Sequence, residues 1–132
     1  GNLKQGLIRI YLTQIYKKKS LIVKGSKHRF RDFVHINDLI KYFNIIINNK
    51  LFYNETFNVG TGKKTTIESI VSYLRDEFKL RFDVKYTKNT KDDQFGVVAD
   101  NRKLIEYSKY KPEISIKKGL KDMVYNIKKK KI

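Results

Sequence analysis

Apolar residues at the start of the chain recur with the period of an α-helix. They stand mostly three or four positions apart, at Leu7, Ile8, Ile10, Tyr11, Ile15 and Tyr16. A helix gathers such positions on one face, so the pattern predicts a helix that ends in the lysine run 17–19. The short apolar stretch 20–23 then predicts a strand, which Gly25 closes.

Four further segments have the β-branched and aromatic composition of strands. They are residues 31–36, 55–59, 80–86 and 95–99. The segment 88–93 is polar and predicts a loop before the last of these strands.

Amphipathic segments between and after these strands predict helices. One begins at Asn37 and Asp38, and its apolar face is expected to hold Leu39, Ile40, Phe43, Ile46 and Ile47. Thr65 and Glu68 have the spacing of a capping box ahead of the next helix.

Two helices are predicted in the last third of the chain. Asp100 can cap a short one around Leu104 and Ile105, in a segment that Pro112 ends. Ser115 can cap the last one, which runs into a lysine-rich end.

This order of elements predicts an α/β fold of mixed helices and short strands, parts of which need a neighbouring sheet. With 132 residues, the chain has the size of one domain or of a fragment of a larger one. We expect residues 1–127 to form the folded portion and residues 128–132 to be a frayed basic tail. No apolar stretch in the sequence has the length that spans a bilayer.

The formal net charge of +17 would attract nucleic acid or a phosphate-bearing ligand. Lys outnumbers Arg 24 to 6, however, and the lysines are spread along the whole chain. Proteins that read nucleic acid favour Arg, whose planar fork fits phosphate and guanine. We therefore favour a generally basic, solvated surface, with a small basic nucleic-acid-binding module as the alternative.

Composition also excludes thiolate and histidine-cluster metal sites. The chain has no Cys, and its only histidines are His28 and His35. The lack of Cys and of a recognisable export signal leads us to expect a cytoplasmic protein.

Two motifs that suggest catalysis do not fit their patterns. The segment 60–65 (GTGKKT) matches neither a P-loop nor a dinucleotide fingerprint, because its glycines and lysines have the wrong spacing, so we expect a tight glycine turn. The pairs Tyr107–Lys111 and Tyr125–Lys129 have the Tyr-x-x-x-Lys spacing, but no glycine-rich cofactor strand precedes either pair. We expect no catalytic residue in this chain.

Arg31 is a better candidate for binding. An Arg on a strand can present its fork rigidly to a diphosphate, although an ion pair with Asp32 or a nearby acid would explain it equally well. His35 on the same segment is expected to be structural rather than a catalytic base.

The segments QGLIRIYLTQ, SLIVKGSKHRFRDFVHINDL, ETFNVGTGKKTTI, DQFGVVADNRKL and YKPEISIKKGLKDMV follow one another in a characteristic order. Together they resemble the C-terminal half of extended short-chain dehydrogenase/reductases, above all UDP-glucose 4-epimerases and related NAD-dependent sugar epimerases and dehydratases. The resemblance implies the C-terminal substrate-binding portion of an extended Rossmann-type enzyme, with a UDP-sugar as its ligand.

The same resemblance implies roles for individual residues. Arg31 matches the Arg that holds the substrate diphosphate, and Asp93 matches the acid that contacts the ribose. The backbone at Ile22 and Lys24 matches the stretch that hydrogen-bonds the uracil edge. The sequence departs from the family at Thr90, where a second Arg is common, at Asp92, which replaces a Gly, and at 109–110, where Lys-Tyr replaces Gly-Trp.

The glycine fingerprint and the catalytic Tyr-x-x-x-Lys of the family precede the matched region. We therefore expect NAD to bind not to this chain but to an N-terminal Rossmann half, in the same longer chain or a separate one. Alone, the chain is expected to be catalytically incomplete; whether it forms a homodimer, or is a truncated product without activity, stays open.

Overall fold

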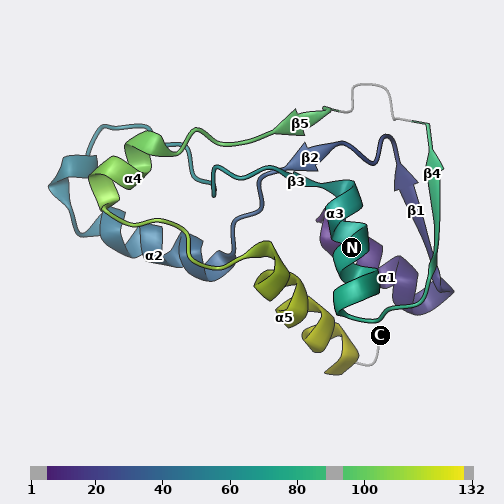
Figure 1. Cartoon of the computed structure of the whole chain (residues 1–132). Coiled ribbons are helices and arrows are strands. Elements are labelled where there is room, and N and C mark those ends of the chain that lie inside the picture. The colour runs from purple at the N-terminus through teal and green to yellow at the C-terminus, as the bar shows by residue number, and fades with distance from the viewer. Residues whose placement is uncertain (1–5, 89–93, 130–132) are drawn as a thin grey trace, which may run out of the picture. The chain divides into compact units, whose positions relative to one another are not determined.

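A computed structural model describes residues 6–88 and 94–129. The chain forms two compact units, whose elements are labelled in Figure 1. Unit 1 joins Gly1–Arg29, Thr66–Phe95 and Lys117–Ile132, and unit 2 joins Phe30–Thr65 and Gly96–Ile116.

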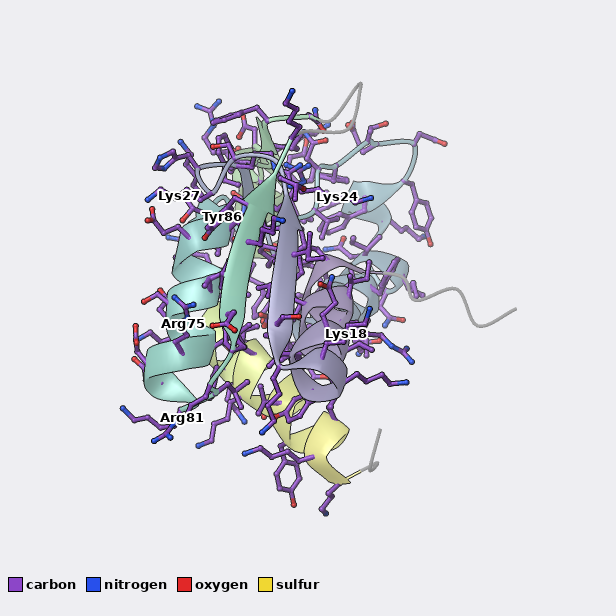
Figure 2. All side chains as sticks on the ribbon, turned by 90° about the vertical axis from the view of Figure 1, so that its right-hand side faces the viewer. Lys18, Lys24, Lys27, Arg75, Arg81 and Tyr86 are labelled. Atoms are coloured by element: carbon purple, nitrogen blue, oxygen red, sulfur yellow. The ribbon has the colours of Figure 1, made fainter. Side chains whose placement is uncertain are left out.

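Unit 1 is built around a pair of parallel strands. β1 (Ser20–Lys24) pairs with β4 (Asp83–Thr87) in a register that sets Ser20 beside Asp83 and Lys24 beside Thr87. α1 (Leu7–Lys18) and α3 (Ile67–Ser72) lie on the two sides of this pair in Figure 2. α3 continues into one π-helical turn, η2 (Tyr73–Glu77).

The first helix and strand confirm the prediction. α1 ends in the lysine run, where Lys19 adopts a left-handed conformation (φ 49°) and donates its N–H to the Ile15 carbonyl. Along β1, Leu21 and Val23 are buried while Ile22 and Lys24 are exposed. This alternation is the one that a half-buried strand requires.

The predicted capping box of α3 is wrong by one residue. Thr66, not Thr65, caps the helix, and its Oγ1 accepts a hydrogen bond from the Ser69 N–H at 3.1 Å. Glu68 does not turn back to the cap but forms an ion pair with Lys27 at 2.6 Å.

The core of unit 1 joins residues from all its segments. Its buried apolar side chains are Tyr11, Leu12, Ile15, Leu21, Val23, Ile67, Ile70, Val71, Leu74, Phe82, Leu120 and Val124. The last two lie on α5 (Ile116–Lys129), which starts directly after Ser115, as predicted. The lysine end of the chain beyond residue 129 lies outside the described residues.

Unit 2 contains a shorter strand pair. β2 (Phe30–Arg31) runs parallel to β5 (Gly96–Val97). Both strands are shorter than predicted, and β2 stops where the Asp32 side chain begins to bind the glycine turn. A further two-residue strand, β3 (Thr65–Thr66), lies at the boundary between the units.

The helix after β2 begins earlier than predicted. α2 (Ile36–Ile47) is capped by His35, whose Nδ1 accepts from the Asn37 N–H at 3.2 Å, so His35 has the structural role expected of it. Asn37 and Asp38 lie in the first turn of this helix.

The predicted apolar face of α2 is only in part the buried one, since Leu39 and Ile46 are half-buried. Ile40, Phe43 and Ile47 are 49%, 53% and 66% exposed, whereas Asp38 and Tyr42 are fully buried. The Asp38 carboxylate accepts hydrogen bonds from the Tyr110 hydroxyl and from the N–H groups of Glu113 and Ile114. These bonds fix which side of the helix faces the core.

An aromatic cluster forms the core of unit 2. Tyr42, Phe52 on η1 (Lys50–Phe52) and Leu104 on α4 (Arg102–Ser108) are buried at its centre. Phe57 packs on Phe52 with the ring centroids 5.1 Å apart, and Tyr107 packs on Phe57 at 5.2 Å.

The strand predicted over residues 55–59 is wrong. These residues have no strand structure, although Phe57 packs into the cluster and the Asn58 side chain donates to the Asp100 carbonyl at 3.4 Å. A strand needs regular pairing of its backbone N–H and C=O groups with a neighbouring strand, whereas the bonds to this segment from Asn58 and Lys103 involve side chains.

The short helix predicted around Leu104 and Ile105 is confirmed as α4, but its predicted cap, Asp100, is wrong by one residue. Asn101 occupies the cap position of α4, but the Asp100 side chain accepts the N–H of Arg102 at 3.3 Å, close to its expected role.

Within residues 6–88 and 94–129, no helix is long and apolar enough to cross a membrane.

Candidate functional site

One edge of β1 presents backbone groups that β4 does not use. Lys19 and Gly25, at the two ends of the strand, bond to β4 through the Lys19 carbonyl and the Gly25 N–H. In a parallel pair, alternate residues bond to the same neighbour. The even-numbered residues Ile22 and Lys24 therefore direct their N–H and C=O groups to the opposite edge.

Two side chains occupy part of this edge. Gln14 on α1 accepts the Ile22 N–H through Oε1 at 2.9 Å. The Arg29 guanidinium donates to the Lys24 carbonyl. Between these contacts lie the Ile22 carbonyl and the Lys24 N–H, an adjacent acceptor and donor that make no hydrogen bond within residues 6–88 and 94–129.

A cavity of about 380 Å³ lies against the same edge. Its lining combines apolar side chains of α1 with the β1 edge: Leu7, Ile10, Tyr11, Gln14, Ile22, Lys24 and Arg29. The volume is within the range of small-ligand sites, which pair apolar walls with a few placed polar groups. All of these residues belong to unit 1.

A buried cation marks one wall of the cavity. Arg29 is only 6% exposed. Burial raises the pKa of Tyr11, and the nearby Arg29 charge opposes that shift. The Tyr11 phenol is therefore neutral at physiological pH and offers a flat apolar face with a polar tip.

Sequence reasoning found Ile22 and Lys24 but missed Gln14 and Arg29. A signal for Gln14 was present, since it continues the helical spacing of Leu7, Ile10 and Tyr11 as a polar residue on an apolar face. No local pattern announces Arg29, whose burial depends on the fold.

Arg31 lies on β2, as predicted. It is half-buried, and its guanidinium Nη1 donates to the Phe30 carbonyl at 2.7 Å. β2 is held by its parallel pairing with β5, so the backbone of Arg31 is rigidly placed in unit 2.

Asp32 is the structural partner of the glycine turn. Its carboxylate accepts the N–H of Thr61 and of Gly62, each at 2.9 Å, and the N–H of Ala99 at 3.3 Å. A Cβ on Gly60 would lie 2.5 Å from Asp32 Oδ2, and Gly62 has φ +70°, so both glycines are required. The turn thus holds a carboxylate of its own chain, which confirms it as a tight structural turn.

The remaining predicted residues divide into two groups. Asp93, Asp92 and Thr90 lie outside the described residues. Tyr110, at the family's Gly-Trp position, hydrogen-bonds Asp38 and thus has a packing role.

Neither Tyr-Lys pair forms a catalytic arrangement. Tyr107 packs in the aromatic cluster, and Lys111 lies beyond the end of α4 at Ser108. Lys129 stacks over the exposed ring of Tyr125, 4.9 Å from its centroid. Among the residues that the structure describes, no group of three or more His, Cys, Asp or Glu could hold a metal ion.

The basic residues of unit 1 are distributed over several elements. Figure 2 shows Lys18, Lys24, Lys27, Arg75 and Arg81 around the strand pair instead of along one stripe. Two of them have partners within the unit: Lys27 pairs with Glu68 at 2.6 Å, and Arg75 donates to the Phe82 carbonyl at 3.1 Å. This distribution favours a solvated basic surface.

Sequence comparison finds relatives but no matching family model. The putative UDP-glucose 4-epimerase of Methanocaldococcus jannaschii is 32% identical over 119 residues, which cover 90% of this chain and 38% of that relative. The dTDP-4-dehydro-6-deoxyglucose reductase of Escherichia coli is 20% identical over 125 residues, covering 95% of this chain and 39% of that relative.

Solved structures share the fold. The UDP-glucose 4-epimerase of Thermotoga maritima, solved with UDP-glucose, matches with a TM-score of 0.86 and 24% identity over 96% of this chain and 40% of that one. The chain thus spans well under half the length of the proteins it matches.

Proposed function

This chain is homologous to the C-terminal portion of NAD-dependent nucleotide-sugar epimerases and dehydratases, and on this premise we propose that it binds a nucleotide sugar. In this proposal, the cavity of unit 1 binds the base of the nucleotide. The observation that carries the proposal is the free acceptor and donor on the β1 edge.

The β1 edge suits the rim of a nucleobase. Bases present neighbouring donors and acceptors in their ring plane, and the Ile22 carbonyl and Lys24 N–H are the matching backbone pair. Backbone groups tolerate any side chain, which explains why Ile and Lys occur at such a site.

The wall of α1 suits the face of the same ring. Leu7, Ile10 and Tyr11 line the cavity on the helix side. A planar base between them and the strand would bury its apolar faces while its rim reaches the polar edge.

The family resemblance adds two further residues to the proposed binding site. Arg31 would hold the diphosphate, for which its position on a paired strand makes it suitable. Asp93, outside the described residues, would contact the ribose.

The glycine-rich turn at 60–62 is not available to a cofactor phosphate. Asp32 engages two of its N–H groups, so the turn does not offer them to NAD. In the proposal, NAD and the chemistry it supplies belong to an N-terminal Rossmann half that acts with this chain.

A substitution on the β1 edge tests the proposal directly. Lys24→Pro removes the N–H offered to the base but no bond to β4, because that N–H faces the other edge. Lys24→Ala, the matched control, removes the same side chain and keeps the N–H.

We expect UDP-glucose, titrated into the full chain by calorimetry, to bind Lys24→Pro at least about tenfold more weakly than wild type. Lys24→Ala should stay within about threefold of wild type. Circular dichroism confirms that both variants are folded. No binding to wild type, or equal binding to both variants, contradicts the proposal, and salt-sensitive binding of RNA or DNA in its place would favour the nucleic-acid alternative.

A further inference from the structure

Gln14 holds a defined position beside the free groups of the β1 edge. It lies on α1, three or four residues from Ile10 and Tyr11, and lines the same cavity. Its Oε1 accepts the Ile22 N–H at 2.9 Å, and its side chain makes no other hydrogen bond within residues 6–88 and 94–129.

That single bond determines the orientation of the Gln14 amide. An N–H donor requires the amide oxygen as its partner, so the oxygen faces Ile22 and the –NH₂ group is left on the other side. Since the side chain lines the cavity, this –NH₂ group is a donor available to a ligand there.

The edge then offers three groups in a row. The Gln14 amide N–H is a donor, the Ile22 carbonyl is an acceptor and the Lys24 N–H is a donor. The next group, the Lys24 carbonyl, is already bound by Arg29. Arg29 thus closes the row and opposes a shift of the ligand by one position along the strand.

Bases differ in how many of these groups they can use. Uracil and thymine present acceptor, donor and acceptor: two carbonyl oxygens with N3–H between them. Cytosine presents a donor followed by two acceptors. It matches the backbone pair only when it is shifted by one position along the strand, a shift that leaves the Gln14 N–H facing a carbon and that Arg29 opposes.

We propose that Gln14 makes this chain selective for nucleotides with an imide base, uracil or thymine, by supplying the third hydrogen bond. The inference rests on the proposed function, because it requires that a base occupies this cavity. It makes Gln14 a specificity-determining residue, with Arg29 as its positioning counterpart at the other end of the row.

Gln14→Glu separates this role from the structural one. The Glu carboxylate still accepts the Ile22 N–H, so the link between α1 and β1 is kept, while the donor becomes an acceptor. Lys18→Gln is the matched control, since it changes the charge of the same helix by the same amount at a residue that does not line the cavity.

The affinities of the full chain for UDP and CDP are measured by calorimetry. We expect wild type and Lys18→Gln to prefer UDP by about five- to tenfold, as one extra hydrogen bond provides. In Gln14→Glu the preference should disappear, chiefly through weaker UDP binding. The Ile22 amide proton, followed by NMR, reports whether its hydrogen bond persists in the variant.

A second measurement needs no substitution. Sulfur accepts hydrogen bonds weakly, so 2-thio-UDP and 4-thio-UDP each weaken one carbonyl contact. We expect both to bind wild type at least about threefold more weakly than UDP. If only one of them does, the third bond is absent and the inference is overturned.

The outcomes distinguish the two proposals. If wild type binds neither UDP nor CDP, the proposed function fails. If it binds UDP but the UDP-to-CDP ratio is the same in Gln14→Glu, the proposed function stands and the role of Gln14 is wrong.

Discussion

The Asp32 carboxylate lies 2.9 Å from the backbone N–H of Gly62, which is thirty positions further along the chain. With the bonds to Thr61 and Ala99, this contact ties the end of β2 to the glycine turn and to the segment after β5. The glycines of the turn are there to let a carboxylate of the same chain approach the backbone.

Asp32→Asn is therefore expected to destabilise the protein by about 2–4 kcal/mol. One carboxylate oxygen becomes an –NH₂ group that faces N–H donors, and the charge that strengthens the remaining bonds is lost. Urea denaturation followed by circular dichroism measures the loss. Asp122→Asn, in an exposed pair with Lys118, serves as control and should change stability by less than about 0.5 kcal/mol.

The hydrogen bonds of Asp38 lead us to expect that the stability of the protein depends on pH in the acid range. Burial alone would raise the pKa of Asp38, but the hydrogen bonds from Tyr110, Ile114 and Glu113 outweigh it and hold the pKa below its usual value. The unfolded chain therefore binds this proton more readily than the folded one. The stabilisation is complete above the unfolded pKa of about 3.9 and is lost as the pH falls through the lower folded value.

We accordingly expect the free energy of unfolding to fall below about pH 4, and to fall less steeply in Asp38→Asn, which has no proton to gain at this site. Denaturation in urea at a series of pH values from about 2 to about 7 gives the free energy of unfolding of wild type and of Asp38→Asn as a function of pH. Parallel curves for the two proteins would contradict this account of Asp38.

The orientation of α2 predicts opposite effects at neighbouring residues. Tyr42 is fully buried and its hydroxyl donates to the Tyr110 carbonyl at 3.2 Å, whereas Phe43 is 53% exposed. Tyr42→Ala should cost about 3–5 kcal/mol, and Phe43→Ala less than about 1 kcal/mol. Thermal melting distinguishes them, and a larger loss for Phe43→Ala would mean that the helix faces the other way.

The proposed contact of Arg31 with the diphosphate predicts that substituting Arg31 weakens the binding of UDP but not of uridine. If it holds the diphosphate, Arg31→Ala should weaken UDP binding by about tenfold or more and leave uridine binding nearly unchanged. Arg31→Lys should fall between, because a point charge replaces a bidentate fork. Equal losses for UDP and uridine would indicate damage to the strand rather than a lost phosphate contact.

Some parts of the protein follow from local sequence pattern alone. The apolar period of residues 7–16 and the short apolar stretch 20–23 correctly predicted α1 and β1, because both signals depend only on neighbouring residues. The spacing of the glycines at 60 and 62 likewise excluded a phosphate loop, and the structure accounts for them in a structural turn.

Other parts depend on partners that are distant in the sequence. The period of α2 marks an apolar face, but Asp38 turns the other side inward through bonds to residues more than seventy positions away. Residues 55–59 have strand composition but form no strand pairing within the part of the chain that the structure describes, so composition alone did not make them a strand. The row of Gln14, Ile22 and Lys24 likewise exists only because a helix and a strand edge meet, since hydrogen bonds are directional and sequence spacing does not encode direction.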